Sequence, residues 1–288
     1  MKLLTFIDQL GAVETATPAN RRATLARLAQ TGWRTAAAAV PAAVLLARPA
    51  AAGSLTTALD GVLLLLQLAR TQAALCTQAL AVPGLVPAAQ VPDFQTMLAH
   101  HQAHIALFGR ALTESGAAVP ATVTFDFSGR RGAATNPELF PGALSVYGRF
   151  LELAQQLADA GGRMCQGVAA VLFDQRLLLA AVVQVLPVEA RHASHLRTLR
   201  RGQGVNLKNW PSAATPALVP PPPAALLAAT TTGEDNKRQL LADNTPIAFA
   251  GLLLAADGNA VQPTALAEAF DEPITPTVAQ AALDLFKV

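Results

Sequence analysis

Charged residues and cysteines are both scarce in this chain of 288 residues. Only 14% of the residues are charged and the net charge is +2, which is too little basic charge for a nucleic-acid-binding surface. Two cysteines cannot build a disulfide framework, and neither stands in a Cys-x-x-Cys pattern. Glycine-rich phosphate-binding loops and the Gly-x-Ser-x-Gly nucleophile motif are also missing. These absences exclude nucleic acid as a partner and several common classes of enzyme.

Apolar residues, in contrast, make up 52% of the chain, and most of them are alanine and leucine. Alanine and leucine favour helices over strands. No apolar run reaches the roughly 20 residues of a membrane-spanning helix without a charge. The composition therefore predicts an all-α protein without a transmembrane span.

Hydrophobic periodicity and the positions of proline and glycine predict four long helices. Each exceeds 20 residues, or about 30 Å at about 1.5 Å per residue. The connections between them are short, long and short, and the long one, residues 119–141, is rich in proline and glycine. This order is typical of a four-helix bundle with one long crossover. The predicted helices are Thr56–Ala81, Asp93–Glu114, Leu144–Leu172 and Asp174–Arg200.

Residues 1–52 contain the elements of an export signal. Arg21-Arg22 precedes an apolar stretch, Ala36–Leu46, and small residues at 49–52 resemble a cleavage point, as in twin-arginine signals. Trp33-Arg34 interrupts the pattern, so an N-terminal helix that stays attached is the alternative. A functional signal predicts a periplasmic or exported protein, and otherwise the protein is expected in the cytoplasm.

The chain then divides into a bundle over residues 53–201 and a tail over residues 202–288. The tail begins with a linker, Gly202–Pro223, which contains the polyproline-like run Pro220–Pro223. The segment Thr275–Phe286 has the pattern of a capped amphipathic helix. Because the tail is small and broken by glycine and proline, we expect it to pack on the bundle instead of forming a second domain.

Two pairs of polar residues stand three positions apart within the predicted helices. Glu189 and His192 form a Glu-x-x-His motif, and His101 and His104 form a His-x-x-His motif. Residues i and i+3 share a helix face, so both pairs can point into the bundle. Glu-x-x-His is half of the ligand set with which some four-helix bundles hold two metal ions. The two pairs are therefore the candidate site.

Several short segments of the chain together have the pattern of a known family. In the bundle they are Ala79-Leu80, Gly84–Pro87, His104–Leu107, Phe125–Phe127, Asp159–Gly161, Gly167 and Val188–Ala193, and in the tail Phe270-Asp-Glu-Pro273 and Thr275. With these segments, the chain from about Gly61 to Arg201 resembles bacterial ferritin-like proteins that are related to plant desiccation-associated proteins. The resemblance implies a ferritin-like fold with a site for two iron or manganese ions.

The resemblance also implies ligands that this chain lacks. The family carries Glu on the first and third helices, each with a Tyr seven residues later, and Glu-x-x-His on the second and fourth. Here the first helix has Ala69 and Cys76 at those positions, and the third has Ala158 and Cys165. The second helix has His101 in place of Glu. Without bridging carboxylates a two-metal site is not expected.

Two interpretations of the remaining residues stay open. His101, His104, Glu189 and His192 can satisfy one another in a metal-free interior, which gives a bundle with a structural, protective or binding role and no enzymatic activity. Alternatively, they hold at most one divalent transition metal ion, with oxidase or catalase-like activity. The expectation is otherwise of no cofactor. Self-association into a homo-oligomer is compatible with the sequence, which identifies no ligand.

The cysteines and a run of arginines allow further hypotheses. Cys76 and Cys165 fill core space as free thiols, pair as a disulfide if an exported fold brings them together, or bind a metal. The run is interpreted as a solvated helix end. It comprises Arg191, Arg197, Arg200 and Arg201.

Overall fold

The computed structural model describes residues 49–238 and 263–288 of the chain, and its side chains over 58–238 and 264–288. Contacts divide the chain into Met1–Gly53 and Ser54–Val288, and the second unit is described below. The predicted export signal lies outside the described residues as far as residue 48. Its last residues, 49–52, belong to a helix.

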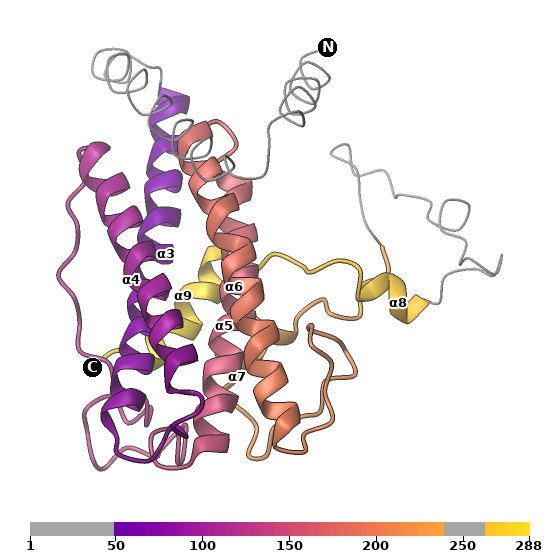
Figure 1. Ribbon diagram of the computed structural model, residues 1–288. Coiled ribbons are helices and arrows are strands. Elements are labelled where there is room, and N and C mark those ends of the chain that lie inside the picture. Colours follow the sequence, from indigo (N-terminus) through magenta and orange to yellow (C-terminus); the bar gives the residue numbers. More distant parts are fainter. Residues whose placement is uncertain (1–48, 239–262) are drawn as a thin grey trace, which may run out of the picture. The chain divides into compact units, whose positions relative to one another are not determined.

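Four long helices confirm the predicted all-α bundle (Figure 1). They are α3 (Pro49–Ala81), α4 (Val91–Glu114), α5 (Tyr147–Val171) and α6 (Arg176–Gly202). Helices α3 and α4 end at Ala81 and Glu114, the residues at which the sequence predicted their C-terminal ends. Helix α3 begins seven residues before the predicted Thr56, because the alanines that follow Pro49 are strong helix formers and proline is tolerated in a first turn.

Burial differs between the central and the outer helices. Side chains of α3 are buried almost all round between Ala58 and Ala79, and every residue of α5 from Leu153 to Cys165 is buried. Helix α4 instead buries one face, with residues at the spacing of a helical stripe. Those residues are Phe94, Met97, His101, His104, Phe108 and Leu112.

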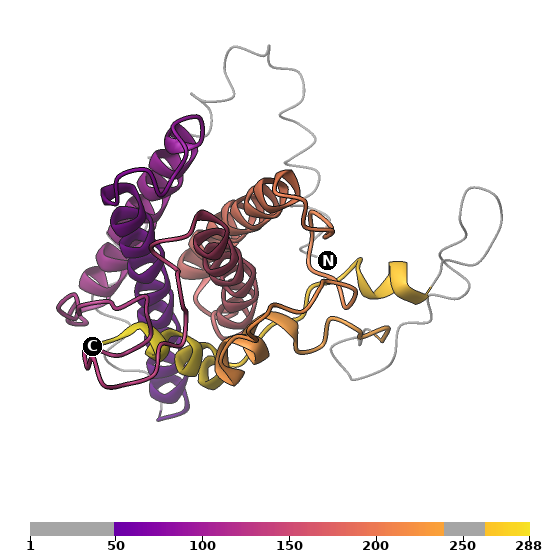
Figure 2. The same ribbon diagram turned by 90° about the horizontal axis from the view of Figure 1, so that it is seen from below.

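The C-terminal segment explains why α5 is buried on all sides. Helices α7 (Ala224–Thr231) and α9 (Pro276–Leu283) both pack against α5, and the short helix η4 (Asp284–Phe286) follows α9 (Figures 1 and 2). Thr275 caps α9 by accepting a hydrogen bond from the backbone N–H of Val278, as its sequence predicted. Helix α8 (Pro263–Ala267) lies earlier in this segment.

Gly167 permits the close approach of this segment to α5. A Cβ atom at this position would overlap the carbonyl oxygen of Ile274, whose backbone N–H donates to the carbonyl of Arg163 one turn earlier. Only glycine leaves room for a second backbone at such a distance. The glycine is therefore required by packing and not by the conformation of α5.

Replacing Gly167 by alanine is expected to destabilise the protein, although alanine is the better helix former. The helix itself gains about 1 kcal/mol from such a change, but the Ile274 backbone must move away from α5. Gly109→Ala in α4 is the matched control, since no atom lies within 4 Å of its added Cβ. Thermal melts should show a lower Tm for Gly167→Ala and an equal or higher Tm for Gly109→Ala. A Gly167→Ala protein as stable as the wild type would contradict the close packing.

The crossover between α4 and α5 is held by the end of the described chain. Phe125 and Lys287 form an antiparallel β-bridge, and the Asp126 backbone N–H donates to the carbonyl of Phe286. The ring of Phe286 lies 5.5 Å from that of Phe127 and 5.0 Å from that of Phe140, between centroids. Among the described residues, the β-prone stretch of the crossover thus forms this one bridge and not a longer strand.

A fully buried arginine anchors the C-terminal segment on α5. The guanidinium of Arg163 donates to the backbone carbonyls of Ala229, Thr232 and Glu272. Its Nε also lies 3.5 Å from a carboxylate oxygen of Asp271 and 3.8 Å from one of Glu234. The hydrogen bonds of the Arg163 guanidinium go to these backbone carbonyls. The carboxyl groups of Asp271 and Glu234 therefore lie near its positive charge without accepting a hydrogen bond from it. Burial, followed by mutual repulsion, raises the pKa of Glu234 to about 7.

These carboxyl groups are expected to make stability fall as pH rises. The pKa of Asp271 is also raised by burial, to about 6. A raised pKa in the folded state contributes stability that is present below about pH 4 and is lost as pH rises through about 6 to 7. Glu234→Gln keeps the side chain neutral, so it should match the wild type near pH 5 and be more stable than the wild type near pH 8.

Urea unfolding of both proteins at the two pH values measures this difference. The comparison with the variant is needed because His101 and His192 titrate in the opposite sense, and their contribution cancels between the two proteins. Glu138→Gln, in an exposed ion pair with Arg130, is the control. A Glu234→Gln protein that is less stable than the wild type at pH 8 would show that the carboxylate stabilises the anchor.

Two helical stretches, Ala58–Ala81 and Arg176–Gly202, are long and apolar enough to cross a membrane by length and composition. The first lies mostly inside the bundle, as the core helix of a soluble protein would. The second carries Glu189 and His192 on its buried face. The expectation of no transmembrane span stays a prediction.

Candidate metal centre

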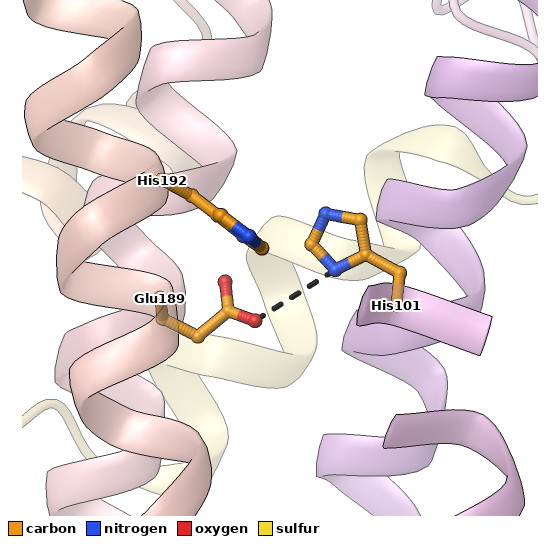
Figure 3. Close-up of side chains that lie close together, drawn as sticks. All are labelled: His101, Glu189 and His192. Carbon is orange, nitrogen blue, oxygen red and sulfur yellow. Dashed lines mark ion pairs between the residues drawn. The ribbon is translucent and has the colours of Figure 1, made fainter. Parts of the chain in front are cut away.

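The four predicted site residues meet between α4 and α6. One ligand atom from each of His101, Glu189 and His192 lies within 4.8 Å of the other two (Figure 3). The Nδ1 atoms of His101 and His104 lie 3.7 Å and 3.3 Å from the same carboxylate oxygen, Oε1 of Glu189. Glu189 is 1% exposed and His101 is 2% exposed. The i, i+3 spacing therefore gave the correct faces of both helices.

Gln72 of α3 positions the carboxylate. Its side-chain Nε2 donates to Oε2 of Glu189 at 2.8 Å, so the other oxygen, Oε1, is the one that faces the histidines. Gly161 of α5 provides the space for this arrangement, since a Cβ there would lie 2.9 Å from Oε2. Helix α5 runs through Gly161-Gly162 without a break. Spacing alone did not indicate either contact.

His100 of α4 positions one of the imidazoles. Its Nδ1 lies 3.0 Å from Nε2 of His192, and the two rings stack with centroids 5.3 Å apart. The second ring nitrogen of His192, Nδ1, has no hydrogen-bond partner among the described residues, and the same holds for Nδ1 of His101, which lies 3.7 Å from Oε1 of Glu189. Buried imidazole nitrogens without partners are uncommon, and metal coordination would satisfy them.

Electrostatics place the cluster in the protonation state that a metal requires. Burial opposes ionisation of Glu189, but His104, His101 and His192 outweigh it and lower the pKa to about 2. Burial is also the main reason that the pKa of His101 falls to about 4 and that of His192 to about 3. At neutral pH the cluster therefore combines the ionised carboxylate of Glu189 with the neutral imidazoles of His101 and His192, and these are the ligand forms of both groups.

The positions at which the family resemblance implied further ligands are apolar in the interior. Ala69 and Ala158 are each 2% exposed and provide no oxygen atom. Cys76 and Cys165 are buried free thiols, and burial raises the pKa of both, for Cys76 to about 12. All eight positions predicted to face the interior are buried. They are Ala69, Cys76, His101, His104, Ala158, Cys165, Glu189 and His192.

The interpretation of the arginine run as a solvated helix end is wrong for two of its members. Arg197 is 2% exposed and makes a two-pronged ion pair with Asp159 of α5, with N–O distances of 3.0 Å and 2.7 Å. Arg200 is 4% exposed and donates to Gln155. Only Arg191 and Arg201 are exposed. Partners from another helix neutralise the buried pair, and sequence spacing gave no sign of them.

Fold and site together define an all-helical bundle protein with a buried histidine and carboxylate cluster between its helices. The sequence profile of the family described as "Ferritin-like domain" matches residues 62–202, so these residues form a ferritin-like domain. The chain matches no curated protein and no solved structure.

The donor set allows a single metal ion. Two imidazole nitrogens and one carboxylate oxygen are a set that zinc, iron and copper accept in proteins, whereas calcium and magnesium prefer oxygen ligands only. Three protein ligands leave at least one coordination position open, as catalytic zinc sites do. Within the described residues, no other group of three such side chains comes as close together.

Proposed function

We propose that this ferritin-like bundle binds one divalent transition metal ion through His101, Glu189 and His192. Glu189 carries the proposal, because its carboxylate is 1% exposed and its ion-pair partners among the described residues are two imidazoles, those of His101 and His104, and no lysine or arginine. An isolated buried charge costs several kcal/mol unless it is compensated. A divalent cation bound to Oε1 supplies the compensation.

We propose further that the bundle has lost the two-metal oxidase chemistry that its resemblance implies. Such a centre needs bridging carboxylates, and the bridging positions are Ala69 and Ala158. A site with one metal and an open coordination position supports a binding or protective role. The relation to desiccation-associated proteins and the export of the chain belong to the same proposal, and they rest on sequence alone.

A metal-free structural role is the second candidate. It is favoured by the hydrogen bonds of Gln72 with Glu189 and of His100 with His192, which satisfy part of the cluster without an ion. Both candidates predict that no rapid oxidation of Fe²⁺ follows when the protein is mixed with Fe²⁺ and oxygen. They differ in whether the purified protein contains a metal.

Elemental analysis of protein purified without a metal-affinity tag distinguishes the candidates. We expect one zinc, iron or copper ion per chain in the wild type, both as purified and after dialysis against a solution of each ion. We expect none in His101→Ala or His192→Ala under either condition. Gln102→Ala, at an exposed position beside His101, is the matched control and should keep the ion. No metal under any condition would support the metal-free candidate. Two ions per chain would show that the oxidase ligand set survives in other residues.

A further inference from the structure

A line of imidazole and carboxylate side chains runs along the seam between α4 and α6, from the surface to the candidate metal centre. At its outer end Nε2 of His195 lies 3.1 Å from Oδ2 of Asp93. Both side chains are open to solvent, with exposures of 40% and 43%. We call Asp93 and His195 the outer pair. It takes no part in the proposed metal site.

His100 and His192 form the middle pair of the same seam. Their ring nitrogens lie 3.0 Å apart, His100 is half-buried, and His192 is 5% exposed. His192 is also one of the three proposed metal ligands. The middle pair therefore has one member toward solvent and one member in the site.

Helix geometry places these pairs in order. On α6, Glu189, His192 and His195 follow at intervals of three residues, each a rise of about 4.5 Å along one face. Asp93 and His100 are seven residues, or about two turns, apart on α4. Asp93 comes before His100 on α4, whereas its partner His195 comes after His192 on α6, so the two helices run in opposite directions along the seam. Exposure falls stepwise from the outer pair through the middle pair to Glu189.

The spacing within each pair suits transient binding of a metal ion. Two ligand atoms, nitrogen or oxygen, that each lie about 2.1 Å from one ion are at most about 4.2 Å apart. The separations of 3.0 Å and 3.1 Å thus allow both members of a pair to contact the same ion with little movement. Each outer position offers two donors and the inner cluster offers three, so binding should be weakest outside and strongest inside.

We infer that Asp93, His195 and His100 form the path by which a divalent transition metal ion of the zinc, iron or copper class reaches the inner cluster. This inference rests on the proposed metal site. The opposite side of the cluster is formed by α3 and α5, where the positions are Ala69, Ala158 and two buried thiols. These four positions carry no imidazole or carboxylate, whereas the α4–α6 seam offers one pair of such groups after another.

Stopped-flow loading of the full-length protein tests this path. The protein is stripped with a chelator and mixed with Co²⁺, whose visible absorption reports binding at the site. His195→Ala, Asp93→Asn and His100→Gln should each slow loading, with the largest effect, about tenfold, for His100→Gln. The final stoichiometry should remain one ion per chain. Gln102→Ala is the control and should load at the wild-type rate.

His100→Gln separates a path from a merely structural role. Glutamine can keep a hydrogen bond to His192 but is a poor ligand for these ions. If His100 only positions His192, the glutamine variant loads as fast as the wild type and only His100→Ala is impaired, which would overturn the inference. Loading rates equal to that of the wild type in both His195→Ala and Asp93→Asn would overturn it as well.

The same experiment distinguishes failure of the inference from failure of the proposed function. A wild-type protein that never takes up Co²⁺, Zn²⁺, Fe²⁺ or Cu²⁺ contradicts the metal site itself, and the path with it. A wild-type protein that binds one ion, and whose seam variants bind it at unchanged rates, contradicts the path alone. Slow loading in the seam variants with unchanged stoichiometry supports both.

Discussion

Replacing Asp159 by asparagine is expected to lower the free energy of unfolding by about 3 to 5 kcal/mol, the usual cost of breaking a buried ion pair. Both side chains of the pair with Arg197 are 3% exposed. The variant removes the negative charge and leaves the guanidinium buried, where no other carboxylate pairs with it among the described residues. The remaining partners of Arg197 are backbone carbonyls and a hydroxyl of the segment after α6.

Thermal and urea unfolding measure the effect. A loss of this size corresponds to a fall in Tm of roughly 6 to 20 °C for a domain of this length. Glu114→Gln makes the same chemical change in an exposed pair with Arg110 and should cost less than about 1 kcal/mol. Asp159→Leu combined with Arg197→Met should cost less than the single asparagine variant, because no charge is left buried. An asparagine variant as stable as the Glu114→Gln control would show that the pair is not needed.

Restoring the ligands that the family resemblance implies is expected to destabilise the protein strongly without recovering a two-metal site. The variant combines Ala69→Glu and Ala158→Glu with His101→Glu. Ala69 and Ala158 are both 2% exposed, so each new carboxylate enters space that is already filled. Overpacking and desolvation together cost several kcal/mol for each substitution. The hydrogen bond of Gln72 and the space at Gly161 have already fixed Glu189 in its present orientation.

Thermal melts of this triple variant with and without Fe²⁺ or Mn²⁺ provide the measurement. We expect a lower Tm than in the wild type and no rise on adding either ion. Thr77→Glu, at an exposed position of α3, is the control for adding a carboxylate to that helix and should change the Tm little. A clear metal-induced rise in the Tm of the triple variant would prove the expectation wrong, because a ligand that binds the native state stabilises it.

The sequence predicted the four helices because their signals are local. Apolar periodicity, prolines at the helix starts and a crossover rich in glycine and proline all lie within the segments they describe. The pairs His101 and His104, and Glu189 and His192, were found for the same reason, since i and i+3 share a face. Because both pairs lie on the interior faces of their helices, they come close together once the four helices form a bundle.

Contacts between distant helices could not be predicted in the same way. Arg197 and Arg200 look like a solvated helix end because their partners lie far away in the sequence, on another helix. Asp159, the partner of Arg197, lies 38 residues earlier, and Gln155, the partner of Arg200, lies 45 residues earlier. His100 is one residue from His101, about 100° further round the helix, so spacing assigns it to a different face. His100 reaches His192 only because α6 packs against α4 at this position. The role of Gln72 likewise depends on where α3 lies relative to α6.

The packing of Phe286, in η4, on the crossover has a consequence for biosynthesis. Phe127 lies about 160 residues before Phe286, which covers it in the folded protein. At the usual rate of about 5 to 20 residues per second, a ribosome needs roughly 8 to 30 seconds to synthesise that interval. During this time the crossover aromatics have emerged but their cover has not. The aromatic side chains of the crossover therefore lack this apolar cover until residues 284–286 have been synthesised.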